Sequence, residues 1–347
     1  MFPFEYLTTK QSAEAINAVA SAPAAAYLAG GTSQIDLMKE GVLRPALLVD
    51  VTDLPYTQIQ ELPDGGIRIG AGVSNTAAAE FPAIRERYPV ISEAIMAGAS
   101  TQIRNMATVG GNPLQRTRCP YYRDTSQPCN KREPGSGCAA VDGINRNHAI
   151  FGFGADPTCV ATHPSDFAVA LAAVDAVVQC VGPDGERSIP FADLHRLPGD
   201  EPQRETTLQH GELITSIDLP PAGGASHYLK ARDRASYAFA LVSCAVHLEL
   251  EDQVINRAKI ALGGVAHKPW RASRAEEMLS GKPASQELFR EAARTAFEAA
   301  TPLRHNEYKV TLGSSLMVRA LMETAGLSPL QGPAGTVFAA SAGGVAG

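Results

Sequence analysis

The hydrophobic pattern of the first 55 residues alternates short apolar runs with one stretch of helical period. Residues 24–31 form an apolar run that ends in two glycines, which is typical of a strand followed by a turn. Residues 32–41 have the pattern of a helix that begins at a Thr/Ser cap and ends at Gly41, and residues 45–51 indicate the next strand. Strand, helix and strand in this order predict a small parallel sheet.

The middle of the chain predicts a different organisation. Residues 65–74 alternate apolar and polar positions after a Pro-Asp-Gly-Gly turn, which indicates a β-hairpin. A helical segment covers residues 81–99, and residues 166–191 show a helix and two strands joined by a Pro-Asp-Gly turn. Residues 115–160 have no periodicity, and an irregular segment of this length inside a compact domain is usually functional.

The C-terminal third has three strands of period two, at residues 228–233, 241–251 and 257–266, followed by helices at 273–280, 285–299 and 311–325. This order predicts a three-stranded antiparallel sheet backed by helices. We therefore expect an α+β protein with an α/β N-terminal part. Its expected units are residues 1–55, residues 56–225 with an insertion at about 115–160, residues 226–330, and a flexible tail at 331–347.

Composition narrows the possible partners of this chain. Its 347 residues carry a formal net charge of −6, which disfavours a nucleic-acid partner or an anionic membrane surface. No apolar stretch reaches the roughly 18–20 residues that a membrane span needs. The N-terminus also lacks the positively charged segment and apolar run of a secretory signal. We therefore expect no membrane span and no signal peptide of the chain's own.

Two glycine pairs are candidates for a phosphate site. One lies in residues 29–35, between a predicted strand and a predicted helix, and the other lies in residues 107–112. Glycines at such positions let the backbone approach a ligand closely, and free N–H groups suit a diphosphate. Neither pair fits the Rossmann or P-loop pattern, and each alone is compatible with a simple turn. Together they favour a dinucleotide that lies between two subdomains.

The two pairs belong to a longer series of motifs that resembles a known family. In order, the series is AGGTSQIDLMK, IRNMATVGGN, HPSDFAVALAAVDA, GELITSIDLP, LKARDRASYAFALVSCAV and ALGGVAHKPWRA. It resembles the FAD-binding medium subunits of the xanthine dehydrogenase and molybdenum hydroxylase family, collinearly over roughly residues 2–325. The resemblance implies a two-subdomain FAD-binding domain of the vanillyl-alcohol-oxidase type, followed by a smaller C-terminal domain.

The resemblance also implies which residues bind FAD. Residues of the first glycine loop would hold the diphosphate, those of the second loop would complete its site, and the others would lie near the ribose, adenine and isoalloxazine. The set is Leu28, Ala29, Gly30, Gly31, Thr32, Ser33, Gln34, Ile35, Thr108, Gly111, Asn112, Asp166, Ile214 and Lys230. Pro113 departs from the family pattern and removes one backbone N–H donor from the second loop.

Four cysteines in the irregular segment are candidate metal ligands: Cys119, Cys129, Cys138 and Cys159. In a large chain without a signal, clustered cysteines favour ligation over disulfides. Their spacing alone leaves an iron–sulfur cluster, a zinc site and free thiols open, although zinc usually takes tight C-x-x-C pairs. The segment resembles the flavin subunits of bacterial periplasmic aldehyde oxidoreductases, which implies a [4Fe–4S] cluster. Cys180 and Cys244 are expected to be core thiols.

The function implied by the resemblance is electron transfer within a heterotrimer. Electrons would come from [2Fe–2S] clusters in a small subunit, after aldehyde oxidation at the molybdenum cofactor of a large subunit, and would pass through FAD to an external acceptor. No residue of this chain is expected to act as an acid, base or nucleophile. The alternatives are a stand-alone flavin oxidase and a flavin subunit whose four cysteines form a structural zinc clip. The resemblance implies a periplasmic complex exported with a signal-bearing partner, with the cytoplasm as the alternative.

Further residues are expected near the cofactors. His163 precedes Asp166 and follows the last cysteine, and Asp233, Arg234 and Tyr237 are candidates for positions beside the flavin. His267 and Trp270 are expected either near the flavin or in a packed turn.

Overall fold

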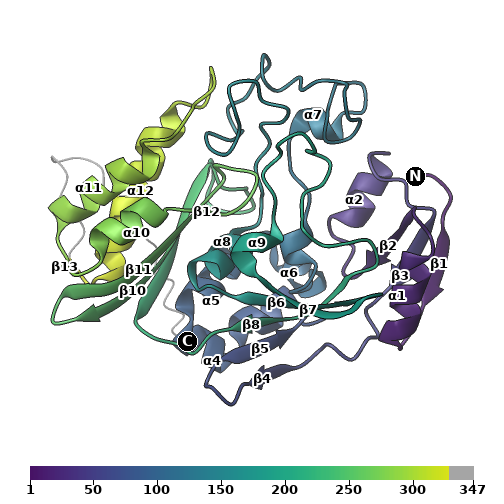
Figure 1. Cartoon of the computed structure of the whole chain (residues 1–347), viewed down its shortest axis with the longest axis horizontal. Helices are drawn as coiled ribbons and strands as arrows, with labels where there is room; N and C mark the ends of the chain where they lie inside the picture. Colours follow the sequence, from purple (N-terminus) through teal and green to yellow (C-terminus); the bar gives the residue numbers. More distant parts are fainter. Residues whose placement is uncertain (328–347) are drawn as a thin grey trace, which may run out of the picture.

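The computed structural model describes residues 1–327, so the tail expected at 331–347 lies outside the described residues. Three β-sheets with their helices lie side by side, and a long irregular segment stands above them at the top of Figure 1. None of the helices in this described part is long and apolar enough to cross a membrane.

The N-terminal sheet is parallel, as the strand–helix–strand order predicts. Its strand order is β1-β3-β2. The strands and helices of this part are β1 (Glu5–Thr8), α1 (Ser12–Ala20), β2 (Ala25–Leu28), α2 (Gln34–Lys39) and β3 (Leu47–Asp50). The predicted hydroxyl cap of α2 is wrong, because Ser33 occupies the N-cap position without a capping side-chain hydrogen bond. The Ser33 hydroxyl is therefore available for a hydrogen bond to another group.

The central sheet is antiparallel, with the order β4-β5-β8-β6-β7. The predicted hairpin is β4 (Ile59–Glu61) with β5 (Ile67–Gly70), and the later strands are β6 (Val177–Gly182), β7 (Gly185–Pro190) and β8 (Leu213–Leu219). Its helices are α3 (Asn75–Glu80), α4 (Pro82–Arg87), α5 (Pro89–Ala97), α6 (Thr101–Met106), α8 (Asp166–Ala173) and α9 (Phe191–Leu194). The single helix expected at 81–99 is therefore two helices, because Pro89 lacks the N–H that would continue the first.

The C-terminal sheet is larger than the three strands expected. Its long strands are β9 (Ala225–Ala231), β10 (Val242–Glu251) and β11 (Val254–Gly263), and β11 also pairs with β12 (Trp270–Arg271) and β13 (Lys282–Pro283). A two-residue strand has no period that a sequence pattern can reveal, which explains the difference. Two helices pack on this sheet, α10 (Ser273–Leu279) and α12 (Tyr308–Thr324), and α11 (Gln286–Phe297) packs against both of them.

The cysteine segment, residues 115–165, contains one helical turn, α7 (Pro120–Arg123), and follows the 3₁₀ turn η1 (Asn112–Leu114). Its backbone is held by internal bonds, such as Asn130 N–H to Gly137 O at 2.7 Å. Arg123 of α7 forms ion pairs with Asp36 and Glu40 of α2, so the segment is fastened to the N-terminal part. The segment is thus irregular and ordered, as its composition predicts.

Candidate functional site

A cavity of about 1060 Å³, the large cavity, lies where all parts of the chain meet. It is lined by both glycine loops, by α5 and β8, by the loop after β9, and by the start of the cysteine segment. This volume is at the upper end of the range for small-molecule sites. The cavity is therefore large enough for an extended ligand such as a dinucleotide.

The first glycine loop forms one wall of the large cavity. Gly31 has a φ of +69°, a conformation that favours glycine. A Cβ on Gly30 would lie only 1.8 Å from the carbonyl oxygen of Met106, so this loop is pressed against the chain just before the second loop. The buried Ser33 Oγ has no hydrogen-bond partner among the described residues. A narrow backbone path and an unpartnered hydroxyl suit a bound diphosphate.

The second glycine loop is fixed by its neighbours in a similar way. Gly110 N–H donates to Ala71 O at 2.9 Å, and a Cβ on Gly110 would lie 2.7 Å from the Ala71 Cβ. Asn112 Oδ1 accepts hydrogen bonds from Ser165 Oγ at 2.5 Å and from Gln115 Nε2 at 3.1 Å. Ser165 also caps α8, so the second loop and this helix are positioned together.

Asp166 and Lys230, which both line the cavity, form a buried ionic group. Lys230 Nζ lies 2.7 Å from one carboxylate oxygen of Asp166, and the Tyr228 hydroxyl donates to the other at 2.5 Å. Burial raises the pKa of Tyr228 well above its ordinary value, and the adjacent Asp166 carboxylate adds to the effect. Both oxygens of Asp166 already accept protein hydrogen bonds, so a ligand hydroxyl would have to use a remaining lone pair.

The structure brings most of the predicted FAD residues to the large cavity. Twelve of the fourteen line it, whereas Leu28 and Ile35 do not. Leu28 ends β2, and Ile35 lies in α2 with its Cγ1 3.0 Å from the position of a Cβ on Gly31. Both therefore lie behind the first glycine loop. Asp233, Arg234 and Tyr237 also line the cavity.

Sequence reasoning missed other lining residues, including Tyr27, Tyr56, Asn75, Gly110, Arg116, Arg118, Asn147, His148 and Phe239. Gly110 is adjacent to a predicted residue, so the glycine pair itself was a signal for it. The others gather through tertiary folding from separate segments. Asn75 Oδ1 and Arg118 Nε are buried without a partner in the described part of the chain, which marks both as candidate ligand contacts.

The four predicted cysteine ligands come together in the cysteine segment. Cys129 and Cys138 pair across an isolated β-bridge. Burial raises the pKa of Cys119 to about 12, and the nearby Cys159 and Cys129 thiols contribute. Burial likewise raises the pKa of Cys159 to about 11, with contributions from Cys138 and Cys129. Cys119 also packs against the apolar group that contains Cys129, so packing and backbone pairing join three of the four cysteines.

The geometry of this group is not that of a single-ion site. Within residues 1–327, no set of three or more His, Cys, Asp or Glu side chains is arranged to hold a metal ion. The six cysteines are all free, and Cys180 and Cys244 are buried in strands as expected. Cys119 is the one member of the group that also lines the large cavity. It therefore lies between that cavity and the other three thiols.

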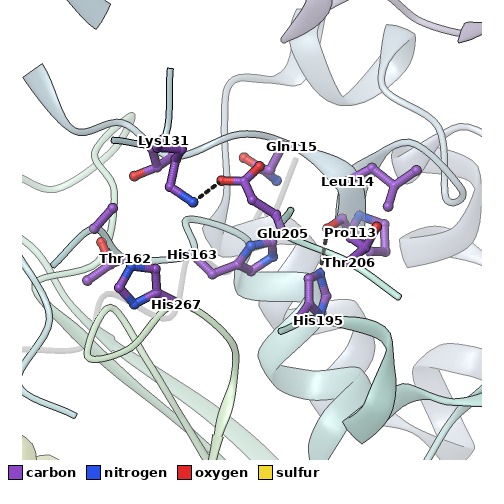
Figure 2. A pocket seen from close by; sticks show the side chains of 12 residues that line it. Pro113, Leu114, Gln115, Lys131, Thr162, His163, His195, Glu205, Thr206 and His267 are labelled. Atoms are coloured by element: carbon purple, nitrogen blue, oxygen red, sulfur yellow. Dashed lines mark hydrogen bonds and ion pairs between the residues drawn. The ribbon is translucent and has the colours of Figure 1, made fainter. Parts of the chain in front are cut away.

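A second, small cavity of about 20 Å³ adjoins the large one. Figure 2 shows His163, His195 and His267 around it, with Glu205 bonded to Lys131 above them. Burial lowers the pKa of His195 to about 4 and holds those of His163 and His267 well below their ordinary value. Several of the ring nitrogens have no partner among the described residues. The volume suits about one water molecule.

The two cavities share part of their walls, namely Leu114, Gln115, Thr117 and Thr162. Burial opposes the charged form of Glu205, but Arg116 and Lys131 together hold its pKa below the ordinary value. His163 and His267 thus lie beside the large cavity rather than in it. Trp270 instead stacks on Phe151 at 4.9 Å in the C-terminal core, which agrees with the packed-turn alternative.

This arrangement defines a dinucleotide-binding protein with an adjoining thiol group, and similarity to known proteins identifies its family. Residues 2–222 match the family described as FAD binding domain in molybdopterin dehydrogenase. Residues 226–324 match the family described as CO dehydrogenase flavoprotein C-terminal domain. The chain therefore belongs to the FAD-binding subunits of the molybdopterin-dependent hydroxylases.

Individual relatives cover nearly the whole chain. The aldehyde oxidoreductase FAD-binding subunit PaoB of Escherichia coli is 46% identical over 93% of this chain and 98% of its own. The glyceraldehyde dehydrogenase medium chain of Sulfolobus acidocaldarius is 26% identical, over 84% of this chain and 87% of its own. A solved carbon monoxide dehydrogenase of Hydrogenophaga pseudoflava covers 94% of this chain and 98% of that chain, with a TM-score of 0.72 and 25% identity.

Proposed function

We propose that this chain is the FAD- and [4Fe–4S]-carrying electron-transfer subunit of a heterotrimeric, molybdenum-dependent aldehyde oxidoreductase. A small subunit with [2Fe–2S] clusters delivers electrons to it, a large subunit holds the molybdenum cofactor, and an external acceptor takes the electrons away. The observation that carries the proposal is the position of Cys119, which lines the large cavity and packs against the apolar group that contains Cys129.

The large cavity fits FAD in its shape and in its polar groups. Both glycine loops line the cavity and lie against neighbouring residues too closely for a Cβ at Gly30 or Gly110, and Ser33 and Asn75 offer polar atoms without a partner among the described residues. FAD exchanges electrons singly or in pairs, while the protein positions it and adjusts its potential. This chain's residues bind and orient the cofactor and keep water from it, in a domain that we propose to be of the vanillyl-alcohol-oxidase type.

The thiol group fits a [4Fe–4S] cluster better than it fits zinc. Zinc holds four sulfurs at about 2.3 Å from one centre. Each iron of a cube binds one thiolate, so the four ligands stand further apart around a larger body. Cys129 and Cys159 are buried and Cys119 and Cys138 are half-buried, without single-ion geometry among the described residues. Lys131, which lies near Cys159, would partly offset the negative charge of a thiolate-bound cluster.

The aldehyde substrate and the presence of partner subunits are proposed from the relative in Escherichia coli that is named an aldehyde oxidoreductase subunit and is 46% identical. The trimeric assembly and a periplasmic location, reached by export with a partner that carries the signal, are proposed from the resemblance of the cysteine segment to the flavin subunits of periplasmic aldehyde oxidoreductases. Folded export of an assembled complex would require no signal on this chain.

A cofactor inventory of the assembled complex tests the proposal. We expect one FAD per flavin subunit and iron in excess of the [2Fe–2S] clusters, by about four atoms. Cys129→Ser should remove that excess iron, because a cube that loses one of four thiolates is held poorly, while FAD remains bound. Iron and acid-labile sulfide analysis together with the absorption spectrum are the measurements.

Cys180→Ser is the matched control, since Cys180 is a buried thiol outside the group that already donates to Arg187 O. It should retain all iron. One zinc per chain and no excess iron would show that the four cysteines form a structural zinc clip and not an iron–sulfur cluster. Absence of FAD would contradict the flavin role itself, and an active single chain without partners would favour a stand-alone flavin oxidase.

A further inference from the structure

The Cys119 thiol has a specific polar neighbour. His148 Nε2 lies 3.2 Å from Cys119 Sγ, across 29 residues of sequence. The imidazole is 97% buried, and its Nδ1 has no partner among the described residues. Both His148 and Cys119 line the large cavity. The pair therefore occupies the boundary between that cavity and the thiol group.

The main chain at His148 is held by buried groups from α12 and the turn that precedes it. Lys309 Nζ donates to His148 O at 2.9 Å and to Gly264 O at 2.6 Å. Asn306 Nδ2 donates to His148 O and to Ala149 O, each at 3.1 Å. Lys309 and Asn306 are both fully buried. The C-terminal part thus fixes the backbone from which this imidazole reaches the thiol.

An iron-bound thiolate is a hydrogen-bond acceptor and has no proton to give. The proton of a contact between the two atoms then belongs to His148 Nε2, which donates it to Cys119 Sγ, and Nδ1 carries the lone pair. Such bonds to cluster sulfurs are among the factors that set the reduction potential of an iron–sulfur centre.

We propose that His148 donates a hydrogen bond to the Cys119 ligand, the one that lines the large cavity, and thereby raises the reduction potential of the cluster. The proposal rests on the proposed function, because it requires the cluster. Reduction adds one electron to the cluster and breaks no bond, and the hydrogen stays on Nε2. The bond strengthens as the thiolate becomes more negative, so it stabilises the reduced state more than the oxidised one.

The ligand chosen for this bond matters for electron flow. Cys129, Cys138 and Cys159 do not line the large cavity, so Cys119 is the ligand beside the flavin site. A higher cluster potential favours transfer from reduced flavin to the cluster, and the bonded ligand is the one nearest the flavin site. Loss of the bond would leave the cluster harder to reduce and would retain electrons on the flavin.

A potentiometric titration of the assembled complex, followed by EPR, tests the proposal. The cluster signal is the one that is absent from the Cys129→Ser complex. His148→Phe keeps a ring but removes the donor, and it should lower the equilibrium constant for one-electron reduction about tenfold, a shift of about 59 mV to more negative potential. His148→Gln keeps an N–H donor and should recover at least part of the shift. His305→Phe, at an exposed histidine near the same segment, should change nothing.

An unchanged potential in a His148→Phe complex with full iron content would overturn the proposal. If this variant loses its iron, the proposal is tested instead by pulsed EPR of the unaltered complex, prepared with ¹⁵N-labelled histidine. A histidine nitrogen and an exchangeable proton coupled to the reduced cluster support the bond, and their absence overturns it. Failure of the proposed function is distinguished by iron analysis, because an unaltered complex without excess iron has no cluster to tune.

Discussion

Gly30 is the residue at which the two glycine loops touch. Its backbone lies against the carbonyl group of Met106, and a Cβ there would meet that oxygen at 1.8 Å. A real contact cannot be this short, so a side chain must push the first loop away from the second. We expect Gly30→Ala to lower FAD occupancy at least tenfold, because the diphosphate path is formed by both loops. Fluorescence of the flavin released by denaturing the purified complex measures the occupancy.

Gly154→Ala is the matched control for this prediction. Gly154 has nothing within 4 Å of an added Cβ and does not have a positive φ. This variant should keep full FAD occupancy. Equal occupancy in the Gly30→Ala complex would mean that the first loop moves without consequence for the cofactor.

At the same scale, the sequence revealed some site residues and not others for a physical reason. The glycine pairs and the cysteines are recognisable because their chemistry is rare and local in the chain. The small cavity instead collects His163 from the cysteine segment, His195 after α9 and His267 after β11. No spacing rule joins these positions, because only the packing of the cysteine segment against the central and C-terminal parts brings them together.

At the scale of elements, α8 positions the second glycine loop. All eight of its residues are buried, and it packs on α5, β10 and β11. Ser165 caps this helix by accepting from Ala168 N–H at 2.9 Å and donates to Asn112 Oδ1 at 2.5 Å. One hydroxyl thus joins a helix end to the loop that lines the large cavity.

We expect Ser165→Ala to lower the free energy of unfolding by about 1 kcal/mol through loss of the cap. It should also weaken FAD binding, because Asn112 loses a donor that fixes its carboxamide.

Ser285→Ala is the matched cap variant, since Ser285 accepts from Leu288 N–H at 3.2 Å in α11, away from the cavity. It should cost similar stability and leave FAD affinity unchanged. Denaturation curves and flavin titration separate the two effects, and equal flavin affinity in both variants would contradict the role of Ser165.

Element prediction succeeded where periodicity was strong and failed where it was short or interrupted. The long strands β10 and β11 follow their period-two pattern, and the parallel order of the N-terminal sheet follows from its strand–helix–strand pattern. The break at Pro89 and the two-residue strands β12 and β13 depend on one residue or on tertiary pairing. The backbone path of the cysteine segment could not be predicted from hydrophobic periodicity, because side-chain and turn contacts determine it.

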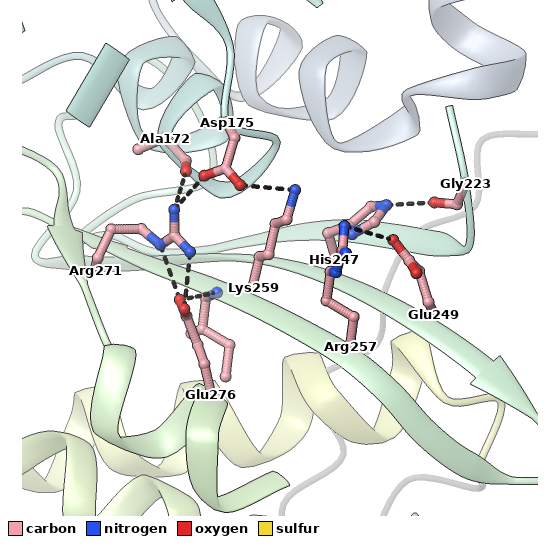
Figure 3. A network of polar contacts seen from close by, with 10 residues as sticks. Ala172, Asp175, Gly223, His247, Glu249, Arg257, Lys259, Arg271 and Glu276 are labelled. Atoms are coloured by element: carbon pink, nitrogen blue, oxygen red, sulfur yellow. Dashed lines mark hydrogen bonds and ion pairs between the residues drawn. The ribbon is translucent and has the colours of Figure 1, made fainter. Parts of the chain in front are cut away.

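At the scale of the whole molecule, polar groups join the C-terminal sheet to the rest. Figure 3 shows one such network, in which Asp175 after α8 contacts Arg271 and Lys259, and Arg271 also contacts Glu276 of α10. Burial opposes ionisation of Asp175, but Lys259 and Arg271 hold its pKa below the ordinary value. The large cavity lies between the parts joined in this way, so these contacts bear on its shape.

A second polar contact between the C-terminal part and the rest of the chain depends on pH, through the charge of His227. His227 of β9 lies between Glu93 of α5 and Glu323 of α12, with each ring nitrogen 2.9 Å from a carboxylate oxygen. The hydrogen bond to Glu93 is the main cause that raises the pKa of His227, and Glu323, which also pairs with Arg319, adds to it. Only the protonated ring can donate to both carboxylates at once.

The pH dependence of stability follows from the sign of this shift. Because the pKa of His227 is higher in the folded state than the ordinary value of 6.5, its contribution is complete below pH 6.5. It is lost as the pH rises through the raised folded value. We expect the complex to be stabilised relative to His227→Gln by about 1 kcal/mol at pH 6, the upper end for a partly exposed ion pair, and by less at pH 9. The denaturation midpoint at the two pH values measures this difference.

His210→Gln is the matched control, because His210 is exposed and its ring forms a hydrogen bond with the Ala22 carbonyl rather than with a carboxylate. It should not show the pH-dependent difference in midpoint that is expected of His227→Gln. A His227→Gln complex with the same pH dependence as the unaltered one would show that the charge of His227 does not contribute to the stability of this contact.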